Sequence, residues 1–458
     1  MGSEIDIVEF EDALERAVIC VEFCLLSPLP FDLDTKPVSQ EYFKQFHVML
    51  DQNLHQLLEI LFRNPLLLEN RERIDPLDVV LTIHEKKLIS KLEEWRVKLL
   101  LLTYEQTEPN PFFQSKQEKY VLGLNRVVQN HANNFGREVL DKVAEKYKEK
   151  LTKDGWKRQL GMIHGFPRFC KEILIQYHGD VNSDMMLFIL SVGSNLVGHY
   201  EPYYKTIGLK IYSWLMQLGD ERRLERMNIH EVIYSECFTM IKKSNEYEYN
   251  DLLYGCLLKV IRIDCSNVIN SNWCSFDEVF AHLLDQAELE SKATVSVMLW
   301  SKIVEFCAVM YDFEIDLTIS DEWYFEDLKI ASQRENLRTI RWNKRLMELM
   351  KREVAKLISI EKIKYMNAFH SIYILCLANT PASEHGALLI DFTKELVKYL
   401  APGTQLFSDD RKFIKAVLLT LRTIQEHQPN PILDEGIQII IQNSRFVEPP
   451  VQINVQFA

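Results

Sequence analysis

The chain has 458 residues, with only 15 glycines and 15 prolines, and a formal net charge of −13. A sheet-rich fold of this length would need many more glycine and proline turns, so the composition favours long helices joined by short connections. The acidic balance argues against wholesale binding of nucleic acid, and no uncharged apolar run approaches the roughly 18 residues of a membrane span.

The nine cysteines are odd in number, and most lie within apolar helical sequence. In a chain of this size this usage is typical of reduced thiols, so we predict a cytoplasmic or nuclear protein. Cys20 and Cys24 are one helical turn apart, but no second pair of ligands lies close in sequence. We therefore expect buried thiols at these two positions, and neither a metal nor a cofactor.

The first third of the chain, residues 1–178, is predicted to be an N-terminal helical region. Apolar residues recur there every three or four positions, and proline-containing stretches separate the segments. The expected helices cover residues 5–26, 41–62 and 78–103, and residues 120–151 form one long helix or two abutting ones.

Gly161 and Gly165 are four residues apart and are followed by Phe166 and Pro167. This pattern indicates a helix end or a close approach between two helices. His164 and Cys170 are residue types that can act as base and nucleophile, but their spacing alone defines no catalytic geometry.

From residue 179 the chain becomes more regular and predicts helix pairs. The pairs are 183–197 with 202–218, 228–242 with 249–263, 276–288 with 293–311, and 323–336 with 339–357, followed by helices over 363–378, 384–399, 409–426 and 432–443. The pairs begin at intervals near the 40–47 residues of HEAT-type repeats, and one such pair cannot bury its apolar stripe alone. We therefore predict an all-α fold, in which residues 179–443 form an irregular α-solenoid of HEAT-like antiparallel helix pairs.

The last residues, 444–458, contain two adjacent prolines and then the alternating sequence VQINVQF. We expect an extended C-terminal tail. It either runs over the surface or docks as a strand-like peptide on the array or on a partner.

The sequence contains no recognisable catalytic motif. It has no phosphate-binding loop and no dinucleotide fingerprint, and His230-Glu231 is followed by Tyr234 where a zinc protease needs a second histidine. We therefore assign no catalytic residues. An all-helical enzyme without a known motif stays open as an alternative of another class.

Five basic residues share one face of the helix predicted over residues 339–357 and its start: Arg338, Arg341, Arg345, Arg352 and Lys356. One interpretation is a solvated face balanced by nearby glutamates. The other is a stripe that binds an acidic or phosphorylated segment of a partner.

Three tryptophans, Trp214, Trp300 and Trp342, stand in three separate helices. Aromatic residues at helical spacing are core residues by default. An exposed tryptophan would instead indicate an interface.

The stretch from Gly198 to Leu209 resembles the second Tel-two-interacting protein family. The matching residues are Glu201, Tyr204, Lys205, Gly208 and Leu209. The family commonly has two aspartates where this chain has Gly198 and His199. On physical grounds, Gly208 would allow close packing of two helices, and Lys205 would cap a carbonyl or pair with an acid.

The resemblance implies a scaffold subunit that turns over no substrate. Members of this family assemble with Tel-two and the first Tel-two-interacting protein into a co-chaperone complex. That complex supports the maturation and stability of phosphatidylinositol-3-kinase-related kinases, together with the ninety-kilodalton heat-shock chaperone and its adaptors. These proteins and the kinase clients are the expected partners, with no nucleic acid and no membrane. Another HEAT-like adaptor, such as a transport receptor or a phosphatase regulatory subunit, is the alternative within the same architecture.

Overall fold

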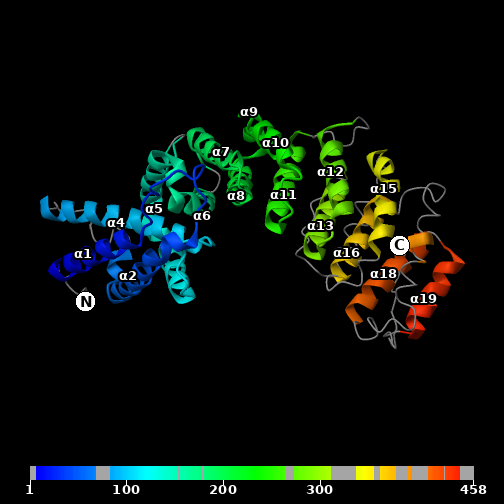
Figure 1. Ribbon diagram of the computed structural model, residues 1–458, viewed down its shortest axis with the longest axis horizontal. Coiled ribbons are helices and arrows are strands. Elements are labelled where there is room, and N and C mark those ends of the chain that lie inside the picture. Colours follow the sequence, from blue (N-terminus) through cyan, green and yellow to red (C-terminus); the bar gives the residue numbers. More distant parts are fainter. Residues whose placement is uncertain are drawn as a thin grey trace, which may run out of the picture. The chain divides into compact units, whose positions relative to one another are not determined.

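The computed structural model of this chain describes residues 7–68, 83–152, 155–177, 180–264, 273–310, 337–354, 362–377, 390–392, 394, 411–427 and 429–443. All regular elements within these ranges are helical (Figure 1), which confirms the predicted all-α class. The chain divides into two compact units, Met1–Ile229 and His230–Ala458.

The predicted border after residue 178 lies within the first unit, where α6 packs on α8 across it. The predicted tail over residues 444–458 lies outside the described residues. The division into three regions therefore stays a prediction.

The first unit consists of α-helices joined by short loops and three 3₁₀ turns. Its elements are α1 (Ile7–Cys24), η1 (Gln40–Phe43), α2 (Lys44–Arg63), η2 (Pro65–Leu68), α4 (Ile83–Thr107), α5 (Glu118–Lys150), η3 (Trp156–Arg158), α6 (Leu160–Tyr177), α7 (Ser183–Val197), α8 (Pro202–Leu218) and α9 (Glu221–Arg226). The stretch predicted as one long helix or two abutting helices is the single helix α5.

The second half of α4 forms the centre of the first unit. Between Trp95 and Gln106 every residue is buried except Lys98, so this helix has apolar residues on all sides and no polar face. A helix of this kind needs neighbours all round. It obtains them from α1, α5 and α6, which all pack against it.

The two glycines of the sequence GMIHG bring α6 close to α4. A Cβ atom at Gly165 would lie 3.1 Å from the main-chain nitrogen of Glu105, and one at Gly161 would lie 2.5 Å from the Glu105 carboxyl. The close helix approach is therefore the correct interpretation of this pattern, and a helix end at Phe166-Pro167 is wrong. Pro167 lies inside α6, which continues past it to Tyr177 although proline has no N–H for the helical hydrogen bond.

The second unit contains two layers of helices (Figure 1). Its elements are α10 (Ile229–Met240), α11 (Tyr247–Asp264), α12 (Ser275–Leu289), α13 (Ala293–Val309), α15 (Leu337–Glu353), α16 (Lys362–Ile372), the π-helical turn η5 (Tyr373–Leu377), α18 (Arg411–His427) and α19 (Pro431–Asn443). In one layer α11 packs on α13, α13 on α16 and α16 on α18. In the other layer α12 packs on α15.

The predicted helix pairs agree with these elements to within a few residues. The pair 183–197 with 202–218 matches α7 and α8 at both ends, and the next two pairs correspond to α10–α11 and α12–α13. The predicted helix 323–336 lies outside the described residues, as does most of 384–399.

Candidate functional site

The α7–α8 pair carries all five residues of the family-like motif. The side chain of Asn182 accepts a hydrogen bond of 2.8 Å from the Met185 N–H and so begins α7. Pro202 occupies the first turn of α8, where its fixed φ angle suits a helix start. The turn of residues 198–201 between the two helices is therefore defined on both sides by local sequence.

Glycines allow the two helices to pack closely. A Cβ atom at Gly208 on α8 would lie 2.7 Å from Val197 Cγ2 and 3.0 Å from the carbonyl oxygen of Gly193 on α7. A Cβ atom at Gly193 would in turn overlap the ring of Tyr212. Contacts this short have no room for a side chain, so both positions require glycine in this packing.

The other motif residues either fill the core or close the turn. Tyr204 and Leu209 are buried. The Lys205 ammonium donates a hydrogen bond of 3.0 Å to the carbonyl oxygen of Val197 at the end of α7. Glu201 lies at the helix start, where its carboxylate accepts a hydrogen bond of 3.0 Å from the Tyr200 hydroxyl. The motif thus supports the turn mainly through packing and capping.

His199 stands where the family commonly has an aspartate, and its side chain is almost fully buried beneath the turn. Its Nε2 lies 3.2 Å from Asp34 Oδ1, and its Nδ1 accepts a hydrogen bond of 3.2 Å from the Glu201 N–H. Burial lowers the pKa of His199, although the Asp34 carboxylate opposes this effect. The imidazole is therefore neutral at physiological pH, with its proton on Nε2 toward Asp34.

Aromatic rings enclose the His199 imidazole. Tyr200 stacks on it with ring centroids 4.5 Å apart, and Tyr204 and Trp156 meet it edge to face at 4.7 and 6.1 Å. These contacts attach the turn to η3, which precedes α6. The position of His199 therefore depends on its own turn and on two segments that are distant in sequence, the loop with Asp34 and η3 with Trp156.

The loop after α1 completes this surface. The Leu29 N–H donates a hydrogen bond of 2.8 Å to the Arg158 carbonyl oxygen, and the Arg158 side chain pairs with Asp32 at 2.6 Å. Lys157 pairs with Asp34, the same carboxylate that faces His199. We call the surface formed by Asp32, Asp34, Lys157, Arg158, Tyr200 and Glu201 the turn surface. Sequence reasoning selected only Glu201 of this group. Asp32, Asp34, Lys157 and Arg158 come from separate segments whose pairing has no local signal, and Tyr200 is not one of the matching motif residues.

His164 and Cys170 lie in the buried core of the first unit. Phe112 and Phe113 pack edge to face on the His164 ring, and burial lowers the pKa of His164 to about 3. Burial also raises the pKa of Cys170 well above its ordinary value. Both side chains are therefore neutral at physiological pH and lack the thiolate that a cysteine nucleophile needs.

Three arginines of the predicted basic stripe pair with acidic residues of α12. Arg341 Nη1 lies 3.2 Å from Asp277 Oδ2, Arg345 pairs with Asp285, and Arg352 pairs with Glu288. Arg338 lies on α15 with an undescribed side chain, and Lys356 lies outside the described residues. The described arginines thus bind α15 to α12, and their use by a partner stays a prediction that would require these ion pairs to open.

Two of the three tryptophans noted in the sequence are core residues. Trp300 and Trp342 are buried, and the Trp342 indole donates a hydrogen bond of 3.0 Å to Asp277 Oδ1. Trp214 is half-buried, with the Lys171 ammonium 5.8 Å from the ring centroid. Among the described tryptophans, Trp273 is the exposed one, at 56 % exposure, and its ring lies near the Arg341 guanidinium and the Trp342 ring.

Within the described residues, no group of three or more histidine, cysteine, aspartate or glutamate side chains is placed to hold a metal ion. None of the described helices combines the length and apolar character that crossing a membrane requires. Comparison with known proteins adds no relative: no protein-family model matches the chain, and no curated protein sequence matches it significantly.

Proposed function

We propose that this chain is a non-enzymatic scaffold subunit of a co-chaperone complex for phosphatidylinositol-3-kinase-related kinases. The supporting observation is the arrangement of the α7–α8 motif. Tyr204, Gly208 and Leu209 pack the helix pair, while Glu201 and Tyr200 remain at its turn beside charged residues of two other segments. A rigid turn of this composition is suited to binding another protein.

The proposed architecture is an irregular α-solenoid of HEAT-like pairs. The packing order of α11, α13, α16 and α18 supports this architecture, because each of these helices packs on the next in one continuous row. In such arrays each pair buries its apolar stripe against the next, and one row of helices supplies an extended surface for partners. The proposed partners are Tel-two and the first Tel-two-interacting protein, with kinase clients and heat-shock chaperone adaptors reached through that complex.

Co-expression with these two companion proteins tests the proposal. We expect the full chain to co-purify with both at equal stoichiometry. The double variant Tyr200→Ala/Glu201→Lys is expected to reduce their recovery, because it removes a 59 % exposed ring and reverses a charge on the turn surface.

The matched control is Tyr247→Ala/Glu231→Lys, which alters a tyrosine of similar exposure, 53 %, and an exposed glutamate in the second unit. An equal loss of companion recovery in both double variants would argue against the turn surface as the binding site. Purification of the native chain with a small GTPase or a phosphatase core, and without the two companions, would favour the other HEAT-like adaptors.

A further inference from the structure

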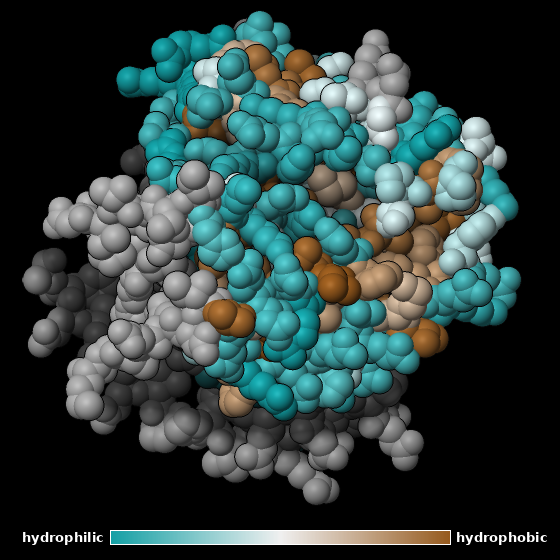
Figure 2. Space-filling view, turned by 90° about the vertical axis from the view of Figure 1, so that its left-hand side faces the viewer, coloured by the Kyte–Doolittle hydropathy of each residue, from teal (hydrophilic) through white to brown (hydrophobic). Residues whose placement is uncertain are grey.

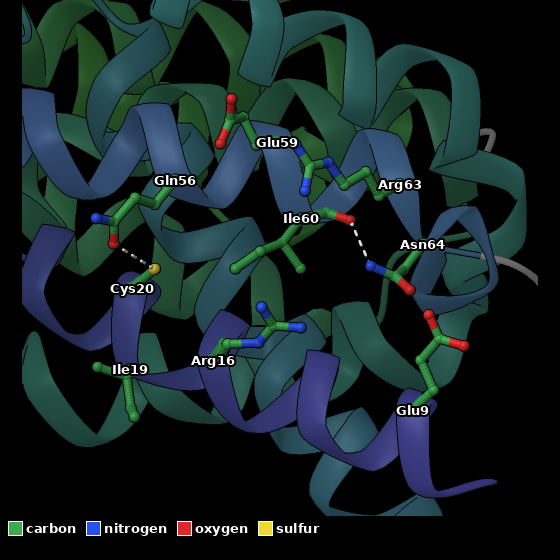
Figure 3. A pocket seen from close by; sticks show the side chains of 9 residues that line it. All are labelled: Glu9, Arg16, Ile19, Cys20, Gln56, Glu59, Ile60, Arg63 and Asn64. Atoms are coloured by element: carbon green, nitrogen blue, oxygen red, sulfur yellow. Dashed lines mark hydrogen bonds between the residues drawn. The ribbon is translucent and has the colours of Figure 1, made fainter. Parts of the chain in front are cut away.

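A cleft between α1 and α2 in the first unit encloses a volume of about 420 Å³ (Figure 3). The two helices are antiparallel neighbours, since Cys24 Sγ donates to the Leu50 carbonyl oxygen and Cys20 Sγ to Gln56 Oε1. We call this space the α1–α2 cleft. None of its lining residues belongs to the turn surface or to the motif.

The neutral polar groups of the cleft are satisfied within the chain. Gln56 accepts the hydrogen bond from the Cys20 thiol at 3.8 Å, and the Asn64 amide donates a hydrogen bond of 3.1 Å to the Ile60 carbonyl oxygen. Burial raises the pKa of Cys20, so this thiol is neutral. The charged side chains must therefore determine which ligand the cleft prefers.

Arg16 on α1 and Arg63 on α2 extend into the cleft from opposite helices (Figure 3). Among the described residues, the ion pair of Arg16 is with Asp12 of its own helix, at 3.2 Å in an exposed arrangement that contributes little energy. No carboxylate of the described residues lies within ion-pair distance of Arg63. Two arginines from opposite helices therefore face one space without an acid that pairs with both of them, an arrangement that suits a carboxylate of a partner.

Two glutamates also line the cleft, and they restrict which anions fit. Glu59 lies 3.9 Å from His55 Nε2, and the Glu9 carboxylate lies beside Asn64 at one end of the cleft (Figure 3). Their charges oppose the accumulation of small anions. A ligand must therefore place its carboxylate between the arginines and gain further contacts elsewhere.

Exposed apolar side chains continue from the cleft along the same helix faces. Ile19, which lines the cleft, is 52 % exposed, and Phe23 one turn later is 50 % exposed. Met49 lies two turns before Gln56 on the same face of α2 and is 41 % exposed. Figure 2 shows the side of the molecule that carries α1, with apolar patches among mainly hydrophilic residues. Apolar patches with a polar rim are characteristic of protein-binding surfaces.

We propose that the α1–α2 cleft binds an acidic amphipathic helix of a partner protein. A carboxylate of that helix lies between Arg16 and Arg63, and its apolar side chains cover Ile19, Phe23 and Met49. Arg16 and Phe23 are seven residues apart, about 10 Å along α1. A ligand helix matches this distance with a glutamate and a leucine two turns apart. This inference does not depend on the proposed co-chaperone function.

The test uses two fluorescent helical peptides and the full chain. The acidic peptide carries glutamates two turns from a pair of leucines, and the basic peptide has lysines in place of the glutamates. We expect saturable binding of the acidic peptide in fluorescence anisotropy. The variant Arg16→Glu/Arg63→Glu should weaken it at least about tenfold and should bind the basic peptide instead. Adding Phe23→Ala should weaken binding of the acidic peptide to the native chain and of the basic peptide to the Arg16→Glu/Arg63→Glu variant.

The control variant Lys44→Glu/Lys116→Glu makes the same change in net charge on exposed residues outside the cleft. Circular dichroism checks that every variant remains folded. The proposal is overturned if the native chain binds both peptides equally or neither peptide, or if the control variant loses binding as strongly as the arginine variant. Concentration-dependent self-association that Phe23→Ala abolishes would show a second copy of the chain as the occupant and would also overturn it.

Discussion

The carboxyl group of Glu105 on α4 lies directly against the main chain of Gly161 on α6, where these two helices pack together. Its Oε2 accepts a hydrogen bond of 3.3 Å from the Leu26 N–H. The groups that shift the pKa of Glu105 include this N–H but no cation. Burial raises the pKa of Glu105 to about 8, so the side chain is largely protonated at neutral pH.

Because the pKa of Glu105 is raised in the folded chain, we expect the first unit to lose stability as the pH rises. The unfolded chain ionises Glu105 near its ordinary pKa of 4.5, whereas the folded chain keeps the proton up to about 8. The folded state therefore binds more protons between these values. This contribution to the free energy of unfolding is fully present below pH 4.5 and is lost as the pH rises through 8. At about 1.4 kcal/mol per pH unit, the loss is on the order of 5 kcal/mol as an upper bound.

Urea unfolding at pH 5 and pH 8 measures this contribution. The variant Glu105→Gln, which stays neutral and retains an acceptor for Leu26, should flatten the pH dependence. The control Glu94→Gln alters an exposed glutamate of the same helix and should leave the slope unchanged. An identical slope in Glu105→Gln and the native chain would contradict the assignment.

Gly208→Leu is expected to destabilise the α7–α8 pair by about 1–3 kcal/mol, because the new side chain would meet Val197 and the main chain of α7. The comparison variant is Gly255→Ala on α11, where an added Cβ meets no atom within 4 Å. Alanine favours a helix by about 0.5–1 kcal/mol over glycine, so this substitution should raise stability. Thermal unfolding distinguishes the two, and equal effects would show that the α7–α8 contact tolerates a side chain.

Trp342→Phe is expected to destabilise the second unit by about 1–3 kcal/mol. Phenylalanine retains most of the ring packing but removes the N–H that binds Asp277, a carboxylate with 0 % exposure. Trp273→Phe, at the exposed neighbouring ring, serves as the control. Unfolding monitored by circular dichroism should show the loss for Trp342 alone, and a neutral Trp342→Phe would indicate that Arg341 suffices for Asp277.

Reversing Arg341 and Arg345 together should lower stability as well as any partner binding through this face. Their ion pairs with Asp277 and Asp285 connect α15 to α12, and glutamates there would face carboxylates, one of them fully buried. We expect a loss of about 2–4 kcal/mol. The exposed pair Lys243→Glu/Lys344→Glu makes the same change in net charge and should stay close to the native chain in a urea titration. If the arginine variant unfolds at the same urea concentration as the native chain, Arg341 and Arg345 belong to a solvated face.

The sequence by itself determined the helical class and most helix limits. Low glycine and proline content and apolar spacing are local signals, and the limits predicted from them for α7 and α8 agree with the structure to the residue. For Gly161 and Gly165 the sequence left open a helix end or a close approach of two helices, and the structure shows the close approach.

Only the tertiary structure decided which groups meet. Arg345 pairs with Asp285, which lies 60 residues earlier in the chain, and His199 contacts Asp34 in the loop after α1. Burial of Glu105 likewise follows from the crossing of α4 and α6 and from no pattern around residue 105. The physical reason is that apolar periodicity acts within one helix, whereas the partner of a charged or polar side chain depends on which helices pack side by side.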